Sequence, residues 1–343
     1  LKKSENLLLV YLNKMTINSL EIVNKIEGNK KAISFFLKNL NITHDANIWM
    51  INGSKGIGKS FLVKLIASSL LAIKYKDNAY EDVFHPDLAV LNKNDNKKYI
   101  SVDEIRNLKK LFYKTSFSGS YRIAIIDSIN DLNLFGHNAL LKTIEEPPKG
   151  SFIFIINHQN SFVPATIKSR CKILNLQKLS DIEVLKVLEK MNFKLEEEEL
   201  YFYSKISRGS VGDAIYFINN NSLPFYKYLC NYFINIEDFN EIDTTKVINS
   251  IIEKKNNLIL VFFKLISLLF KKVIKKMFLN QYSILIKEEK LLIEKFSKLY
   301  SKSNIFHIIE IIETKYNNYI ALNTDLHTTL YSLLIELHKN IKK

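Results

Sequence analysis

Short apolar runs alternate with helical spacing through the first half of the chain. Such runs are typical of buried strands, and the segments between them repeat apolar residues every three or four positions, as helices do. We predict strands at 47–51, 88–91, 122–126, 152–156 and 172–176. Helices are predicted between them at 59–72, 102–114 and 138–146. Strands that alternate with helices form a parallel sheet covered on both faces, so an α/β fold is expected.

Beyond about residue 179 the apolar pattern becomes helical throughout. Three short helices are predicted at 180–191, 196–207 and 211–219, and Pro224 is placed in a linker after them. The remainder of the chain is predicted to be helical to its end. We therefore expect an α/β domain over 1–178, a small helical domain over 179–222 and an all-helical domain over 223–343.

Residues 53–60 read GSKGIGKS and match the phosphate-binding pattern G-x-x-x-x-G-K-S/T in full. The match lies between a predicted strand and a predicted helix, which is the setting that this pattern requires. Gly53, Gly56 and Gly58 let backbone N–H groups approach phosphates, Lys59 would neutralise them, and Ser60 would bind Mg²⁺. The sequence therefore predicts a site for ATP or ADP with Mg²⁺, and a chance glycine turn is the weaker alternative.

An acidic residue follows the third predicted strand. Asp127 is the expected second carboxylate of the magnesium site, although an Asp at a strand end can also cap a helix. The next residue is Ser128, where many ATPases of this type carry a Glu that activates water. A serine hydroxyl cannot take that proton near neutral pH, so we expect nucleotide to bind and to be hydrolysed poorly.

Composition adds few constraints. The net charge is +14, but only four of the 49 basic residues are arginine, namely Arg106, Arg122, Arg170 and Arg208. This bias towards lysine is typical of an AT-rich genome, so basicity alone is weak evidence for DNA binding. The two cysteines, Cys171 and Cys230, form no zinc motif and fit a reducing cytoplasm. The apolar runs at 7–12 and 258–270 are too short or too interrupted by lysine to predict a membrane span.

Residues 138–148, NALLKTIEEPP, strongly resemble a signature of bacterial clamp-loader subunits, which are AAA+ proteins. Residues 166–171, TIKSRC, resemble a second motif of that family, and HPDL at 85–88 resembles a third. The resemblance covers about residues 20 to 220. It implies an AAA+ nucleotide-binding domain, a helical lid and a C-terminal collar that assembles with partner subunits.

The resemblance also assigns roles to particular residues. Arg170 would be an arginine finger that reaches a neighbouring subunit's ATP, and Asn157 would sense the γ-phosphate. The alternative for Arg170 is an ion pair within the fold or a surface position. Gly212 stands where the motor subunits, gamma and tau, carry a sensor arginine, and together with Ser128 it makes the chain more similar to delta-prime subunits.

The function implied is that of a delta-prime-like clamp-loader subunit. Its expected partners are gamma/tau and delta subunits, the sliding clamp and primer-template DNA, with no membrane and no zinc involved. Two alternatives stay open at this point. One is an active ATPase of the gamma/tau type, and the other is a scaffold subunit that binds no nucleotide.

Overall fold

The computed structural model describes residues 19–40, 46–71, 85–93, 97, 99–113, 117, 121–158, 162–238, 240–253, 257–280, 282–322 and 324–341. The apolar run at 7–12 lies outside the described residues. The chain forms two compact units. The first contains the chain up to Phe193 together with Arg208–Gly212, and the second contains Lys194–Ser207 with Asp213–Lys343. The domain boundaries at 178 and 222 stay predictions.

A five-stranded parallel sheet with strand order β2-β3-β4-β1-β5 forms the centre of the first unit. The strands are β1 (Asn47–Gly53), β2 (Leu88–Asn92), β3 (Arg122–Asp127), β4 (Ser151–His158) and β5 (Lys172–Asn175). The five predicted strands and the predicted α/β fold are therefore confirmed. The central strands β3 and β4 are almost continuously apolar because helices cover both faces of the sheet.

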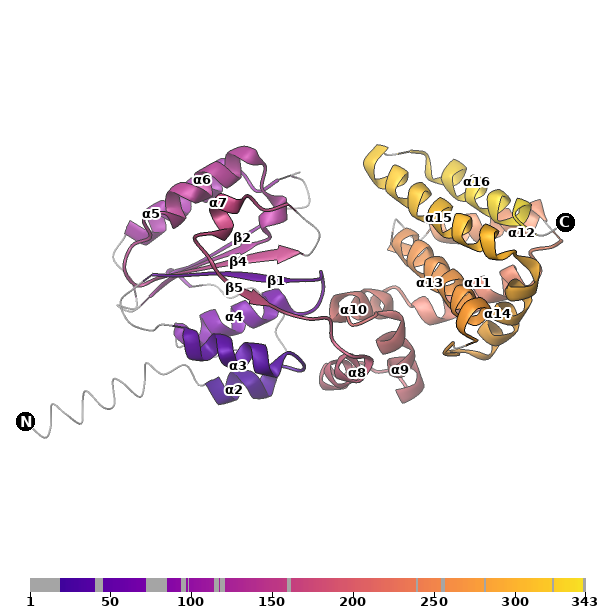
Figure 1. Cartoon of the computed structure of the whole chain (residues 1–343), viewed down its shortest axis with the longest axis horizontal. Coiled ribbons are helices and arrows are strands. Elements are labelled where there is room, and N and C mark those ends of the chain that lie inside the picture. The colour runs from indigo at the N-terminus through magenta and orange to yellow at the C-terminus, as the bar shows by residue number, and fades with distance from the viewer. Residues whose placement is uncertain are drawn as a thin grey trace, which may run out of the picture. The chain divides into compact units, whose positions relative to one another are not determined.

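Helices lie on both faces of this sheet (Figure 1). One face is covered by α2 (Ser19–Lys25), α3 (Lys30–Asn39) and α4 (Lys59–Leu70), and the other by α5 (Val102–Tyr113), α6 (Leu134–Ile144) and α7 (Ala165–Lys168). Alternate residues of β4 serve the two cores. Phe154 packs in the same core as Phe36 of α3, whereas Ile153 packs with Leu140 of α6.

Helix α6 begins at Leu134, earlier than the residue 138 expected from the apolar pattern. The side chain of Asn133 caps it by accepting a hydrogen bond from the Gly136 N–H at 2.9 Å. Leu134 and Phe135 in the first turn are 68% and 71% exposed, so they do not continue the buried stripe of the helix. The bounds of the other helices and strands predicted up to residue 219 agree within two residues.

The rest of the described chain is helical, as predicted. Helix α8 (Asp181–Lys190) belongs to the first unit and begins with a capping box formed by Ser180 and Glu183. The remaining helices are α9 (Glu197–Ile206), α10 (Val211–Asn219), α11 (Ser222–Ile234), α12 (Glu241–Ile252), α13 (Asn257–Leu279), α14 (Lys287–Leu299), α15 (Lys302–Leu322) and α16 (Leu326–Lys339). The linker predicted at Pro224 is wrong, since this residue lies in the first turn of α11. A proline is tolerated there because the first N–H groups of a helix have no partner within it.

A buried ionic group joins three helices of the second unit. The carboxylate of Glu289 on α14 is 0% exposed and accepts hydrogen bonds from Lys272 Nζ of α13 at 2.6 Å and from Tyr226 of α11 at 2.5 Å. Its other oxygen accepts the Leu285 N–H at 2.7 Å. Burial and the adjacent Glu289 charge raise the pKa of Tyr226 well above its ordinary value. Glu289 thus accepts a hydrogen bond from a side chain of each of the two other helices.

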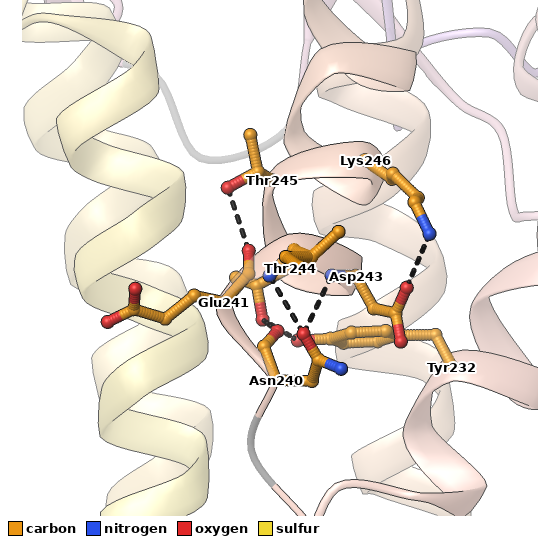
Figure 2. A network of polar contacts seen from close by, with 8 residues as sticks. Tyr232, Asn240, Glu241, Asp243, Thr244, Thr245 and Lys246 are labelled. Atoms are coloured by element: carbon orange, nitrogen blue, oxygen red, sulfur yellow. Dashed lines mark hydrogen bonds and ion pairs between the residues drawn. The ribbon is translucent and has the colours of Figure 1, made fainter.

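Polar side chains fix the start of α12 in the same unit (Figure 2). Asn240 Oδ1 accepts the Ile242 N–H at 2.9 Å, and the hydroxyl groups of Tyr232 and Thr244 lie 2.8 Å apart. Lys246 pairs with Asp243 at 2.8 Å.

The apolar stretch at 258–270 is part of α13 and is largely buried, as expected of a core helix. None of the described helices is long and apolar enough to cross a bilayer.

Candidate nucleotide site

The phosphate-binding sequence forms a tight loop between β1 and α4. Gly53 ends the strand, and Gly58 is the residue immediately before the first turn of the helix. Gly56 and Gly58 adopt φ angles of 80° and 94°, a left-handed conformation that favours glycine. The first turn of α4 contains no acidic residue, so the positive end of the helix is not neutralised from within. The backbone is therefore suited to hold an anion.

Lys59 lies in this loop with its side chain turned back along it. Its Nζ donates to the carbonyl oxygens of Gly53 at 2.7 Å and Ser54 at 2.6 Å, and the residue is only 4% exposed. Burial lowers the pKa of Lys59 to about 8, and the negative charge of Asp127 partly opposes this shift. A desolvated ammonium group held in place in this way needs little reorganisation to meet a phosphate.

The structure brings the predicted magnesium residues to the same edge of the sheet. Ser60 is half-buried in the first turn of α4, and Asp127 is the half-buried last residue of β3. Desolvation and the nearby positive charge of Lys59 lower the pKa of His158, which ends β4, and Asp127 counteracts them. The described residues include no cluster of three or more His, Cys, Asp or Glu side chains that could hold a metal ion unaided. Ser60 and Asp127 offer one hydroxyl and one carboxylate, and Mg²⁺ usually takes its remaining ligands from substrate phosphates and water.

Ser128 has a structural role in place of a catalytic one. Its hydroxyl donates to Asp131 Oδ2 at 2.9 Å, and it caps the short 3-10 helix Ile129–Asp131. The residue is 1% exposed. The position next to Asp127 therefore offers no carboxylate to a water molecule.

Asn157 is held by a row of asparagine side chains that the sequence reading did not identify. Its Nδ2 donates to Asn52 Oδ1 at 3.0 Å, and Asn52 Nδ2 donates to Asn175 Oδ1 at 3.0 Å. These residues lie on the neighbouring strands β4, β1 and β5, where Asn52 is paired in register with both others. The available signal was a polar residue near the carboxyl end of each apolar strand.

Arg170 lies at the surface, two residues after the end of α7. Its Nη2 is 3.0 Å from Glu145 Oε1, and Nη1 donates to the Thr166 carbonyl oxygen at 2.9 Å. The two side chains of the ion pair are 38% and 47% exposed. The next residue, Cys171, packs against the apolar core beneath α6, and burial raises its thiol pKa to about 12. The guanidinium is thus not buried within its own domain.

The segment Ser210–Gly212 lies directly against the phosphate loop. The Gly212 N–H donates to the Gly56 carbonyl oxygen at 2.8 Å, and the Ser210 hydroxyl donates to the Lys55 carbonyl oxygen at 3.3 Å. Sequence reasoning noted Gly212 only for the missing arginine. The contact joins residues about 155 positions apart, and no local pattern marks it.

Comparisons with known proteins match this chain to subunits of DNA polymerase III. Residues 28–180 match a family model described as DNA polymerase III, delta subunit. The DNA polymerase III subunit gamma of Buchnera aphidicola from Schizaphis graminum is 27% identical over 63% of this chain and 61% of that protein. The DNA polymerase III subunit delta' of Buchnera aphidicola from Baizongia pistaciae is 26% identical over 60% of this chain and 66% of that protein. The matched regions thus span less than two thirds of the length of each of these two relatives.

A solved structure also shows similarity. It is a DNA polymerase III gamma subunit-related protein of Thermotoga maritima, 16% identical, with a TM-score of 0.45, and the match covers 87% of this chain and 95% of that one.

Proposed function

Since this chain is a member of the clamp-loader family, we propose that it is a delta-prime-type subunit of DNA polymerase III that holds a nucleotide and hydrolyses little of it. The proposal is supported by two features that lie together at the carboxyl edge of the sheet. The phosphate loop is complete and Lys59 is in place, whereas the residue after Asp127 is a serine engaged in capping. Such a site favours binding over turnover.

The nucleotide's phosphates would occupy the loop 53–60. Backbone N–H groups and the start of α4 supply partial positive charge, and Lys59 supplies a full one. Ser60 and Asp127 would hold the Mg²⁺ ion, which neutralises phosphate charge when bound. Asn157, fixed by Asn52, would contact the terminal phosphate. The loop geometry supports either ATP or ADP as the ligand.

Weak hydrolysis follows from what surrounds the loop. Attack by water on the terminal phosphate requires a group that orients or deprotonates the water. Ser128 offers neither function because its hydroxyl already donates to Asp131. Gly212 contributes no positive side chain. A gamma/tau-type ATPase is the alternative that robust turnover would support.

Arg170 would act on the neighbouring subunit's nucleotide. A guanidinium is permanently charged and matches phosphate oxygens with two parallel donors. Its ion pair with Glu145 is exposed, and exposed pairs contribute only about 0–1 kcal/mol. A phosphate group with its larger charge could therefore displace Glu145 at small cost.

In the proposed complex this chain works with gamma/tau and delta subunits to load the sliding clamp onto primer-template DNA in the cytoplasm. Residues 179–222 would form the lid over the nucleotide, and 223–343 would join the collar. Any contact with DNA in this chain would be to phosphates, so it would depend on salt rather than on sequence.

Three measurements test the proposal. Titration of the isolated chain with a fluorescent ATP analogue should show saturable, Mg²⁺-dependent binding that Lys59→Ala abolishes. If the wild-type chain shows none, the scaffold alternative is correct. Steady-state ATP turnover by the chain alone should be close to background, and robust turnover lost in Lys59→Ala would support the gamma/tau alternative.

The third measurement concerns Arg170. In a reconstituted loader, Arg170→Ala should assemble normally and lower ATP turnover on the order of a thousandfold at the site it serves. Arg106→Ala is the matched control, because Arg106 is another exposed arginine, paired only with Asp103 in its own helix turn. Equal turnover in the Arg170 variant and the control would remove the finger role.

A further inference from the structure

The Ser210–Gly212 segment approaches the phosphate loop more closely than side chains would allow. A Cβ atom on Gly56 would lie 2.2 Å from Ser210 Oγ, and a Cβ atom on Gly212 would lie 3.0 Å from Gly56 Cα. A Cβ atom at 56 would require Ser210 Oγ to move, and one at 212 would require the Gly56 backbone to shift by a few tenths of an ångström. Glycine at both positions therefore permits this close approach. A further hydrogen bond holds the residue before this segment, since the Leu179 N–H donates to the Gly209 carbonyl oxygen at 3.2 Å.

The two hydrogen bonds from this segment fix the orientation of two peptide groups in the loop. They are accepted by the carbonyl oxygens of Lys55 and Gly56. A trans peptide group is planar, and its C=O and N–H point in opposite directions. The carbonyl of Lys55 shares a peptide group with the N–H of Gly56, and that of Gly56 shares one with the N–H of Ile57. These two N–H groups must therefore point away from the segment.

We propose that Ser210–Gly212 is a positioning element of the nucleotide site, which turns the N–H groups of Gly56 and Ile57 towards the phosphates. The inference rests on the proposed nucleotide binding. Donors that are already oriented lose little freedom when an anion binds, so the segment raises affinity without touching the ligand. The hydrogen bond between Gly212 and Gly56 has a second effect. The Gly56 carbonyl oxygen accepts the Gly212 N–H, which lies in the first turn of α10 and has no acceptor within that helix.

Gly212 thereby gains a function of its own. It is the last residue of the Arg208–Gly212 segment of the first compact unit, and the chain belongs to the second unit again from Asp213 on. The hydrogen bond to Gly56 thus joins the phosphate loop to the first turn of α10. A Cβ atom at 212 would press on Gly56 Cα and force the segment and the loop apart by a few tenths of an ångström, which would weaken the hydrogen bonds to both carbonyl groups.

The test uses full-length Gly212→Ala and Ser210→Ala. Alanine is the better helix former, so Gly212→Ala should not weaken α10 itself. Asp213→Asn is the matched control, because Asp213 is the next residue of α10 and forms an ion pair with Lys264 of α13. The readouts are thermal midpoint, hydrogen exchange of a peptide covering 53–60 without nucleotide, and Mg²⁺-dependent binding of a fluorescent ATP analogue.

We expect Gly212→Ala to speed hydrogen exchange in the loop and to weaken binding about tenfold, the effect of one well-formed hydrogen bond. Ser210→Ala removes the longer bond and should weaken binding about threefold. The control should match wild type, and all thermal midpoints should be similar. Inorganic pyrophosphate, used as a competitor, should lose affinity by the same factors because it contains only the groups that the loop binds.

Unchanged exchange or unchanged affinity in Gly212→Ala would overturn the positioning role while nucleotide binding by the wild type stands. An equal loss in Asp213→Asn would also overturn it, because the effect would then belong to α10 in general. Absence of binding by the wild type would instead refute the nucleotide proposal and this inference with it. Faster exchange in Gly212→Ala would then show only a structural contact.

Discussion

The lowered pKa of Lys59 should make nucleotide affinity fall as the pH rises above neutrality. In the free protein this pKa is lowered to about 8 because the ammonium group is buried in the loop. Phosphates favour the charged form, so the pKa of Lys59 rises when nucleotide binds. Binding therefore takes up a proton once the pH exceeds the free-protein pKa, and affinity falls as the pH rises further.

The magnitude follows from the fraction of charged lysine. With a pKa of about 8, roughly nine tenths of Lys59 is charged at pH 7 and roughly one tenth at pH 9. If only the charged form binds phosphate, the affinity should fall about tenfold between these pH values, which is about 1.4 kcal/mol. An ordinary exposed lysine would be charged at both, and the affinity would be nearly constant.

Titration with a fluorescent ATP analogue and Mg²⁺ at pH 7, 8 and 9 measures this slope. Lys59→Arg should bind with an affinity independent of pH, because a guanidinium stays charged throughout. Lys55→Ala should keep the wild-type slope, since Lys55 is an exposed lysine of the same loop. A wild-type protein that binds at pH 7 and changes less than twofold by pH 9 would show that Lys59 is not desolvated as the structure implies.

Two further predictions concern the buried ionic group and the asparagine row. Glu289→Ala should lower the free energy of unfolding of the second unit by about 3–5 kcal/mol, because it removes the buried carboxylate that pairs with the Lys272 ammonium group and accepts the Tyr226 hydroxyl. Urea unfolding followed by far-UV circular dichroism should show this, while the fluorescence of Trp49, the single tryptophan, should report an unchanged first unit; a loss below about 1 kcal/mol would contradict it. Asn52→Ala removes the acceptor that holds Asn157 and should reduce the ratio of ATP to ADP affinity about threefold, with ADP affinity unchanged. Competition titrations measure both affinities, and an equal loss for ATP and ADP would show that Asn157 does not sense the terminal phosphate.

The sheet could be predicted from the sequence because its strands are buried on both faces. Strands such as Phe152–Ile156 and Ile123–Ile126 are short, continuous apolar runs, and the glycine, asparagine and charged residues around them limit them to the length of a strand. The phosphate loop was equally visible because its glycines and lysine act within eight consecutive positions. Apolar periodicity does not predict the ends of a helix or strand where the residues are exposed. Helix α6 starts at exposed apolar residues, so its first turn carries no periodic signal.

Long-range hydrogen bonds were beyond sequence reasoning for a different reason. Asn52 and Asn157 are about 105 positions apart, and either alone is an ordinary strand-end residue. Only the register of β1 against β4 places them opposite each other. Propensity and periodicity contain no information about that register, because they describe one segment at a time.

Gly212 shows the same difference at a single residue. In the sequence, Gly212 stands where the gamma and tau subunits carry a sensor arginine. The missing arginine explains only why the site would hydrolyse ATP poorly. In the structure the missing side chain is what permits the Gly212 N–H to reach the Gly56 carbonyl at 2.8 Å. A site that needed only to stop hydrolysing could have accepted any uncharged residue at 212. Because a Cβ atom at 212 would lie 3.0 Å from Gly56 Cα, the proposed positioning of the phosphate loop gives a reason for glycine there that loss of catalysis alone does not.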